Sequence, residues 1–171
     1  MPRMIKFLGL ILGLLLTLSA QTSAPVHTAT LIGEIAPSAS VKVTRPVKVV
    51  MLSETYTNMY DREALQRIDE YWEQFKPAFL ESKELFYQVS QVAQSEAIEF
   101  VVSRMRQDGV DLSRMQRDTS ADGRFEFRNV PPGEYKIVAY GSMGSSDFVW
   151  QGWTDLESSE PVRIQLKTTL P

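Results

Sequence analysis

The sequence predicts a mainly β domain, a sandwich of about seven strands that is interrupted by an α-helical hairpin. Apolar and polar residues alternate along residues 118–141 and again along 161–167, as they do in strands that bury one face. Between residues 58 and 108 the apolar residues instead recur at every third or fourth position, which indicates helices. No internal repeat is visible, so we interpret the helical segment as an insertion into a single β domain.

Residues 118–141 read as turn, strand, turn, strand. Asp122 and Gly123 form the first turn, because glycine accepts positive φ at no steric cost and aspartate can bond its own backbone. Phe125 and Phe127 then fall on one face of a strand, and we expect that face to be buried. The Pro-Pro-Gly run that follows must leave the ladder, since proline has no N–H to donate. A second strand comes next, with its inward residues at Tyr135, Ile137 and Ala139.

These residues resemble the signature of the carboxypeptidase regulatory-like, or transthyretin-like, β-sandwich family. Residues 119–127 and 130–137 carry the resemblance, and residues 33–35 and 41–43 match the family's first strands loosely. The resemblance implies a seven-stranded transthyretin/prealbumin-like sandwich that forms a single domain over residues 21–171. It specifies a fold and not a reaction, because in that family the domain usually accompanies another function.

The helical insertion is expected over residues 58–109. Asn58 is a suitable N-cap, and Gly109 follows the last periodic residue, where glycine often ends a helix. A single straight helix of this length would extend about 75 Å, and the chain that follows is too short to return over that distance. We therefore expect two antiparallel helices with a break between Pro77 and Ser82, and one long kinked helix is the alternative.

The remaining strands are shorter and less regular. Residues 27–35 and 41–51 read as strands, with Pro46 at a bulge or an edge. A further strand begins at Phe148 after a Gly-Ser-rich turn, and the last strand starts after Pro161.

Residues 1–20 are typical of a secretory signal peptide. Arg3 and Lys6 flank the start of an apolar run of about 12 residues, which is shorter than the roughly 20 that a membrane span needs. Cleavage is expected after Ala20, with Ala24 as the alternative site and an uncleaved anchor as the alternative outcome. The mature protein would then be secreted or periplasmic and would have no membrane span.

Composition limits the classes of partner. Removing the signal peptide takes two of the 18 basic residues and none of the 21 acidic ones, which leaves a net charge of about −5 and disfavours nucleic acids and anionic membranes. The chain has no cysteine, so no disulfide and no lipid-modified cysteine can form. An exported protein without cysteine is typical of a bacterial envelope.

Few residues could support catalysis. His27 is the one histidine in the sequence and cysteine is missing, so neither a zinc site nor an acyl-transfer triad can be assembled. Residues 118–123 look like the first half of a calcium loop, but the twelfth position, where such a loop has a bidentate glutamate, is Asn129. We therefore expect no enzyme activity, no cofactor and no metal.

Two groups of residues are candidate binding sites. Phe148, Trp150 and Trp153 could form an aromatic platform for a ligand, although strand alternation would bury the first two and leave Trp153 exposed. The helices also carry more apolar residues than two helices bury against each other. The surplus residues form a second apolar flank beside the main apolar face, and this flank predicts a partner interface at Leu80, Leu85, Val92 and Val101. The alternative is that this flank packs on the outer face of a sheet.

The sequence thus predicts a secreted or periplasmic, non-catalytic binding or structural module. The first hypothesis is association with a protein partner, or with a second copy of the chain, through the helical insertion. The alternative is a carbohydrate-binding or enzyme-accessory module that uses the edge formed by Trp150 and Trp153.

Overall fold

The computed structural model describes residues 28–36, 46–143, 146–157 and 160–168. The signal peptide, His27 and the strand expected at residues 41–43 lie outside the described residues. The elements follow one another in this order: β1 (Ala29–Ile35), β2 (Lys48–Leu52), α1 (Glu54–Glu81), α2 (Lys83–Gln107), α3 (Leu112–Met115), β3 (Gln116–Asp118), β4 (Arg124–Val130), β5 (Gly133–Met143), β6 (Ser146–Leu156) and β7 (Val162–Thr168).

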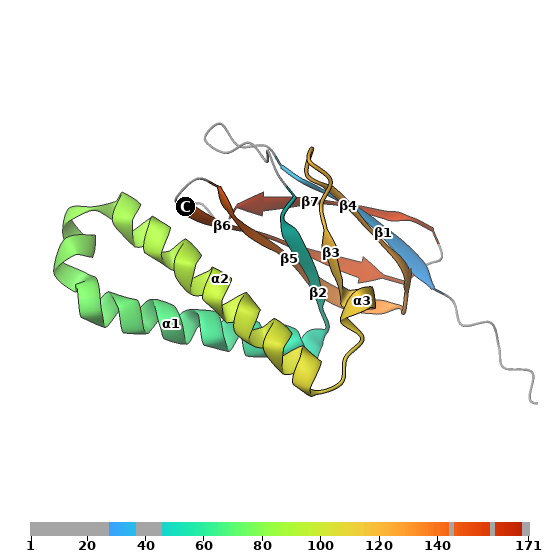
Figure 1. Ribbon diagram of the computed structural model, residues 1–171, viewed down its shortest axis with the longest axis horizontal. Coiled ribbons are helices and arrows are strands. Elements are labelled where there is room, and N and C mark those ends of the chain that lie inside the picture. Colours follow the sequence, from blue (N-terminus) through green and yellow to red (C-terminus); the bar gives the residue numbers. More distant parts are fainter. Residues whose placement is uncertain (1–27, 37–45, 144–145, 158–159, 169–171) are drawn as a thin grey trace, which may run out of the picture.

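The seven strands form one mixed sheet in the order β3-β2-β5-β6-β7-β1-β4. Neighbouring strands are antiparallel except β1 and β7, which run parallel. The sheet curls so far that its two edge strands approach each other, and the guanidinium of Arg117 in β3 lies 5.6 Å from the ring centroid of Phe127 in β4 (Figure 1). The described residues therefore form a nearly barrel-shaped sheet where the sequence predicts the two sheets of a sandwich.

The inside of the curled sheet holds the first of two apolar cores. Gly33 lets the ring of Phe125 lie against the β1 backbone, because a Cβ at this position would be 2.0 Å from the ring. Phe125 in turn packs edge to face on Phe127, with the ring centroids 6.0 Å apart. The other large side chains of this inner core include Leu31, Met51, Ile137, Trp150, Leu156 and Leu166.

The order turn, strand, turn, strand expected for residues 118–141 is confirmed. Gly123 has a φ of 84°, both phenylalanines of β4 are buried, and the Pro-Pro pair lies between β4 and β5, outside the ladder. Asn129 adds a feature that the sequence analysis missed. Its φ is 57°, and the register between β1 and β4 shifts beside it, so β4 contains a β-bulge at this point.

The helical segment begins earlier than its capping pattern predicts. α1 starts at Glu54, directly after β2, with Ser53 as its N-cap residue, so Asn58 lies inside the helix and the expectation that it caps the helix is wrong. Thr57 explains the earlier start, because its N–H bonds the carbonyl of Ser53 and its hydroxyl donates to the carbonyl of Leu52.

At the other end of the hairpin, Gly109 terminates α2 as expected. It has a φ of 77°, and its N–H donates to the carbonyl of Arg106. The N–H of Val110 donates to the carbonyl of Met105. This pair of bonds satisfies two of the carbonyls that a helix C-terminus leaves free.

Ser82 separates the two helices. Its backbone is extended, and its hydroxyl accepts a hydrogen bond from the N–H of Leu85 at 3.2 Å, so it caps α2. Pro77 remains inside α1. The helix bends two residues before it, where the backbone of Phe75 is not helical, with a φ of −119° and a ψ of 15°. α1 and α2 pack side by side, so the alternative of one long kinked helix is wrong (Figure 1).

α1 and α2 cover the outer face of β2, β5 and β6 and form the second apolar core there (Figure 1). The strands contribute outward apolar residues: Val50, Leu52, Val138, Tyr140 and Val149. The helices contribute, among others, Tyr60, Ala97, Ile98, Val101 and Met105. The surplus apolar surface of the helices therefore belongs largely to the core of the monomer, as the alternative interpretation held.

The helices also change the fold class. They comprise 28 and 25 residues, so the description "mainly β" is only partly right. In the parts of the chain that the structure describes, no helix is both long enough and apolar enough to cross a membrane.

Candidate functional site

The three aromatic residues of the predicted ligand platform lie on both faces of β6. Trp150 points into the inner core and is 1% exposed, and the half-buried Phe148 stacks on it with ring centroids 5.9 Å apart. The burial of Trp150 means that its predicted place in a ligand platform is wrong, and the half-buried Phe148 packs against it. Trp153 lies on the opposite face and is 60% exposed, as strand alternation predicted.

A buried lysine supports the indole of Trp153. Lys136 lies directly opposite Trp153 in the β5–β6 pair and is 6% exposed. Its ammonium forms an ion pair with Asp61 of α1, and it lies 5.4 Å from the ring centroid of Trp153 and 4.9 Å from that of Tyr60. Because a buried ammonium is costly unless it is paired, the ion pair holds Lys136 in place beneath the indole.

Two glutamines join this region to both helices. The side-chain amide of Gln151 donates to Oη of Tyr60 at 2.9 Å and to Oε1 of Gln94 at 2.7 Å, so β6, α1 and α2 meet at one point. Burial raises the pKa of Tyr60 well above its usual value, and the negative charge of Asp61 raises it further. The phenol therefore stays neutral and can remain in the core.

We call Trp153, Lys136, Asp61 and Gln151 the Trp153 surface. It offers an exposed indole, a carboxylate whose side chain is 49% exposed, and a primary amide. The indole can stack on an apolar ring face, and the carboxylate and amide can accept hydrogen bonds from hydroxyl groups. This combination suits a flat ligand that is apolar on its faces and polar at its edge.

The four residues of the predicted partner interface do not share one surface. Val101 is fully buried against the sheet, so its assignment to an interface is wrong. Val92 is half-buried and lines a cleft between α2 and the sheet. Leu80 and Leu85 lie at the far end of the hairpin and are 71% and 37% exposed. α2 packs on β6 and β5 along only part of its length, which explains why its flank is buried at Val101 and exposed at Leu85.

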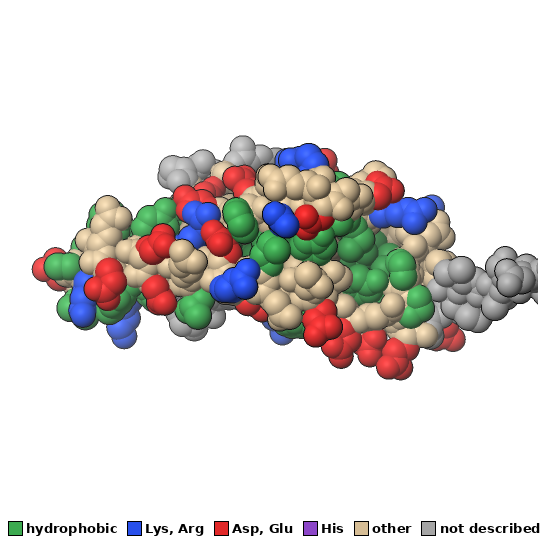
Figure 2. All heavy atoms as spheres, turned by 90° about the horizontal axis from the view of Figure 1, so that it is seen from below, with side chains coloured by type: hydrophobic (Ala, Val, Ile, Leu, Met, Phe, Trp, Pro, Cys, Tyr) green, Lys and Arg blue, Asp and Glu red, His purple; other side chains and the backbone are tan. Residues whose placement is uncertain are grey.

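The far end of the hairpin contains a separate aromatic cluster. The ring of Phe86 is 5.5 Å from that of Trp72 and 5.4 Å from that of Phe79, measured between centroids. Phe75 contacts Phe79 at 6.1 Å and is 41% exposed. We call the exposed residues here, Phe75, Leu80 and Leu85, the tip patch. Figure 2 shows hydrophobic side chains at this end of the molecule, away from the sheet.

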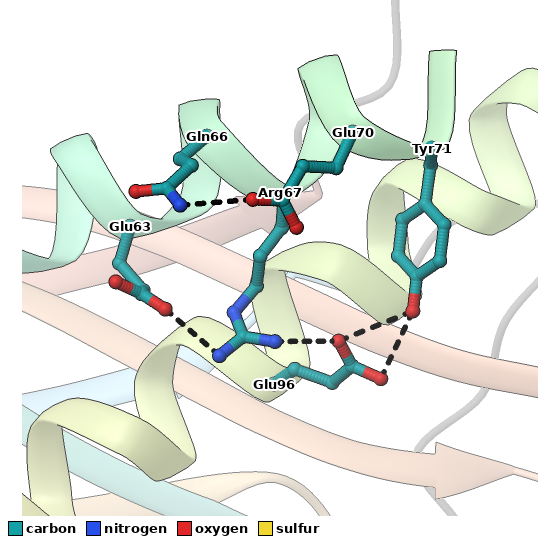
Figure 3. Close-up of polar contacts among 6 residues, drawn as sticks. All are labelled: Glu63, Gln66, Arg67, Glu70, Tyr71 and Glu96. Carbon is teal, nitrogen blue, oxygen red and sulfur yellow. Dashed lines mark hydrogen bonds and ion pairs between the residues drawn. The ribbon is translucent and has the colours of Figure 1, made fainter. Parts of the chain in front are cut away.

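A polar cluster joins the two helices between the tip and the sheet (Figure 3). Arg67 of α1 bonds Glu63, one turn earlier, at 2.8 Å and Glu96 of α2 at 3.0 Å. The hydroxyl of Tyr71 donates to the same Glu96 carboxylate at 3.2 Å. Glu96 is thereby fixed by α1, while it also lines the cleft between α2 and the sheet.

Sequence reasoning missed Lys136, Tyr60 and Asp61 as site residues. Asp61 and Lys136 are 75 positions apart, and no local pattern connects positions at that separation. One signal was available in β5, where the outward residues after Lys136 are Val138 and Tyr140. A strand that is apolar on both faces must be covered on both, and that reading places the helices beside Lys136.

No protein-family model matches the chain, and no curated protein matches its sequence. Among solved structures, the chain is similar to a Pseudomonas aeruginosa protein described as a "putative carbohydrate binding protein". The similarity covers 85% of this chain and 92% of the other, with 16% sequence identity and a TM-score of 0.41. A similarity of this extent assigns neither a family nor a ligand.

Proposed function

We propose that this chain is a non-catalytic binding module and that the Trp153 surface binds a saccharide. The observation that carries the proposal is the indole of Trp153, which is 60% exposed and yet is supported by the buried, ion-paired Lys136. An exposed aromatic ring that is already fixed loses little conformational entropy when a ligand stacks on it. The C–H face of a sugar ring is a suitable partner for such an indole.

Polar groups beside the indole support the same proposal. Asp61 is half-exposed although its carboxylate is paired with Lys136, so one side of it remains accessible to ligand hydroxyls. Gln151 adds an amide that is anchored by Tyr60 and Gln94. Sugar hydroxyls at the rim of a stacked ring could bond these groups, because carboxylates and amide oxygens accept such bonds.

We also propose that the protein is exported and that its β domain is of the carboxypeptidase regulatory-like type. The short apolar run before Ala20 supports export, and the residues of the motif in β4 and β5 support the family. N-terminal mass analysis of the envelope fraction is expected to find a chain that starts at Gln21. An intact Met1 in the membrane pellet would contradict export.

Association with a protein partner is the second candidate function. The observation that favours it is the tip patch, because Leu80 is 71% exposed and Phe75 is 41% exposed at the end of the hairpin. Neighbouring large apolar side chains in water are typical of an interaction site. Pull-down from an envelope extract with the wild-type protein and with Leu80→Ser tests this candidate.

Binding to a glycan array tests the saccharide proposal. The wild-type protein is expected to bind at least one class of glycan, and Trp153→Ala is expected to weaken that binding about tenfold, the loss of a stacking contact worth roughly 1.4 kcal/mol. Lys136→Met should also weaken it, because the indole loses its support. A wild-type protein that binds no glycan would contradict the proposal.

Phe100→Ala is the matched control, since Phe100 is also an exposed aromatic residue, at 45%, but lies on α2 outside the Trp153 surface. It should bind glycans as the wild type does. Equal losses in Phe100→Ala and Trp153→Ala would show that binding depends on exposed aromatic residues in general and not on the Trp153 surface.

A further inference from the structure

A second candidate site lies at the other end of the sheet face that carries Trp153. It is a cleft of about 500 Å³ between α2 and the ends of β2, β5 and β6. Tyr140 lies at this end of β5, four residues from Lys136, which is about 13 Å along a strand. The cleft and the Trp153 surface are thus separate places on one face.

Tyr140 contributes a hydroxyl group to this cleft. The residue is 6% exposed, it lines the cleft, and its hydroxyl makes no hydrogen bond with any residue that the structure describes. The ring is buried, but the hydroxyl opens into the cleft, because it is not among the fully buried polar atoms that lack a partner in the described residues. A hydroxyl group still needs a hydrogen-bond partner there. Its position indicates that a ligand or solvent in the cleft supplies that partner.

The phenol remains protonated over the physiological range. Burial raises the pKa of Tyr140 to about 12, and the negative charges of Glu99 and Asp118 raise it while Arg106 opposes them. A protonated phenol can donate one hydrogen bond and can accept others.

The wall of the cleft is acidic. Among its described lining residues, Lys48 carries the one positive charge, against the carboxylates of Glu96, Glu99 and Asp147. Glu96 is held by Arg67 and Tyr71, and Asp147 accepts a hydrogen bond from Ser142. Glu99 makes no hydrogen bond or ion pair with the described part of the chain, so its charge is available to a ligand.

These carboxylates do not form a metal site. No group of three or more histidine, cysteine, aspartate or glutamate residues in the described segments is arranged to hold a metal ion. Charges spread over a cleft of this volume suit a ligand larger than a metal ion, and Val92 supplies an apolar wall for its body.

We propose that this cleft binds a small organic cation with an ammonium group, which Glu99 and Asp147 neutralise and the hydroxyl of Tyr140 contacts. The geometry that carries the proposal is the juxtaposition of the unpartnered Tyr140 hydroxyl with carboxylates from α2 and β6. Ammonium groups donate up to three hydrogen bonds, and both carboxylates and a phenol oxygen can accept them.

Three probes of similar length and different charge test the proposal. Cadaverine, 1,5-pentanediol and glutarate are each titrated into the isotope-labelled full chain, and amide chemical shifts report binding. Cadaverine should shift the amides of residues 95–99 and 140–142 and should bind more weakly as salt is added, because its attraction is electrostatic. Glutarate and pentanediol should leave these amides unchanged. Equal responses to all three probes, or no response to cadaverine, would overturn the proposal.

Variants separate this site from the Trp153 surface. Glu99→Gln should weaken cadaverine binding about tenfold, and Tyr140→Phe, which keeps the buried ring, should weaken it roughly fivefold. Glu73→Gln, an exposed carboxylate on α1 outside the cleft, should bind as the wild type does. Trp153→Ala should bind cadaverine normally even where it loses glycan binding. Loss of cadaverine binding in Glu73→Gln to the same degree would show only general charge attraction and would overturn the assignment to the cleft.

Discussion

The helical hairpin has two different environments along its length. In its base, which we define as residues 54–64 and 97–107, Ile98, Val101 and Met105 are fully buried against the sheet. In its tip, residues 72–86, the aromatic rings pack on one another, and Leu80 is 71% exposed. The polar cluster of Arg67 and Glu96 lies between the two parts (Figure 3).

Both parts have the same helical periodicity in the sequence, so the difference shows what periodicity can reveal. It identifies the apolar face of a helix, but it does not identify what covers that face. For the base, the cover is the outer face of β2, β5 and β6. We therefore expect the base to contribute to folding and the tip to be dispensable for it.

Deleting the hairpin should have the largest effect. Replacing residues 54–107 by a short Gly/Asn loop would expose five apolar side chains on the outer face of the sheet: Val50, Leu52, Val138, Tyr140 and Val149. Burial of such side chains contributes about 1.5–3 kcal/mol each, and a whole domain is stable by only about 5–15 kcal/mol. The variant should show no cooperative thermal transition in circular dichroism. A retained β-type transition would mean that the whole hairpin is a separable insertion and would contradict this expectation.

A matched pair of substitutions should separate base from tip. Val101→Asp places a charge in the second core without a cation beside it and should lower the free energy of unfolding by about 3–5 kcal/mol. Leu80→Asp makes a comparable change at an exposed position and should alter it by less than about 0.5 kcal/mol. Urea denaturation measures both values. Similar losses for the two variants would contradict the distinction.

Alkaline pH should destabilise the second apolar core, in which Tyr140 of β5 packs against the base of the hairpin. The pKa of Tyr140 is about 12 in the folded protein, against 10.0 for the free side chain, because burial disfavours the phenolate. The folded state thus holds this proton more tightly, so the stabilisation is complete below about pH 10 and is lost as the pH rises toward 12. Urea midpoints measured from pH 8 to 12 should fall over this range. The urea midpoint of Tyr140→Phe should fall less steeply with pH. An identical decline in the two proteins would show that the Tyr140 phenol does not titrate with unfolding.

The sequence predicts the local features of this protein better than its global arrangement. The turn at Gly123, the buried faces of β4 and β5 and the end of α2 at Gly109 follow from patterns of a few residues. Whether the sheet closes on itself depends on the order of the strands and on the curvature of the sheet. The alternation of apolar and polar residues within a strand specifies neither of these. A barrel-like sheet and a sandwich bury the same alternate residues, so Phe125 and Phe127 could not distinguish them.

The candidate site shows the same limit. Strand alternation predicted that Trp153 is exposed and that Trp150 is buried. The support beneath Trp153 comes from Lys136 and Asp61, which the fold brings together from β5 and α1. Phe127 in the inner core gives a second example. Arg117 of β3 lies 5.6 Å from the ring centroid of Phe127, a cation that no pattern around β4 indicates.

Native-state hydrogen exchange tests most directly the central claim that the base of the hairpin belongs to the core and the tip does not. Amides of residues 97–105 in α2 should exchange only when the whole domain unfolds, so their opening free energy should equal the global value from urea denaturation. Amides of residues 79–88 around Ser82 should exchange through local opening, with a clearly lower free energy and little dependence on denaturant. Equal protection of the two segments, or faster exchange in the base, would contradict the account.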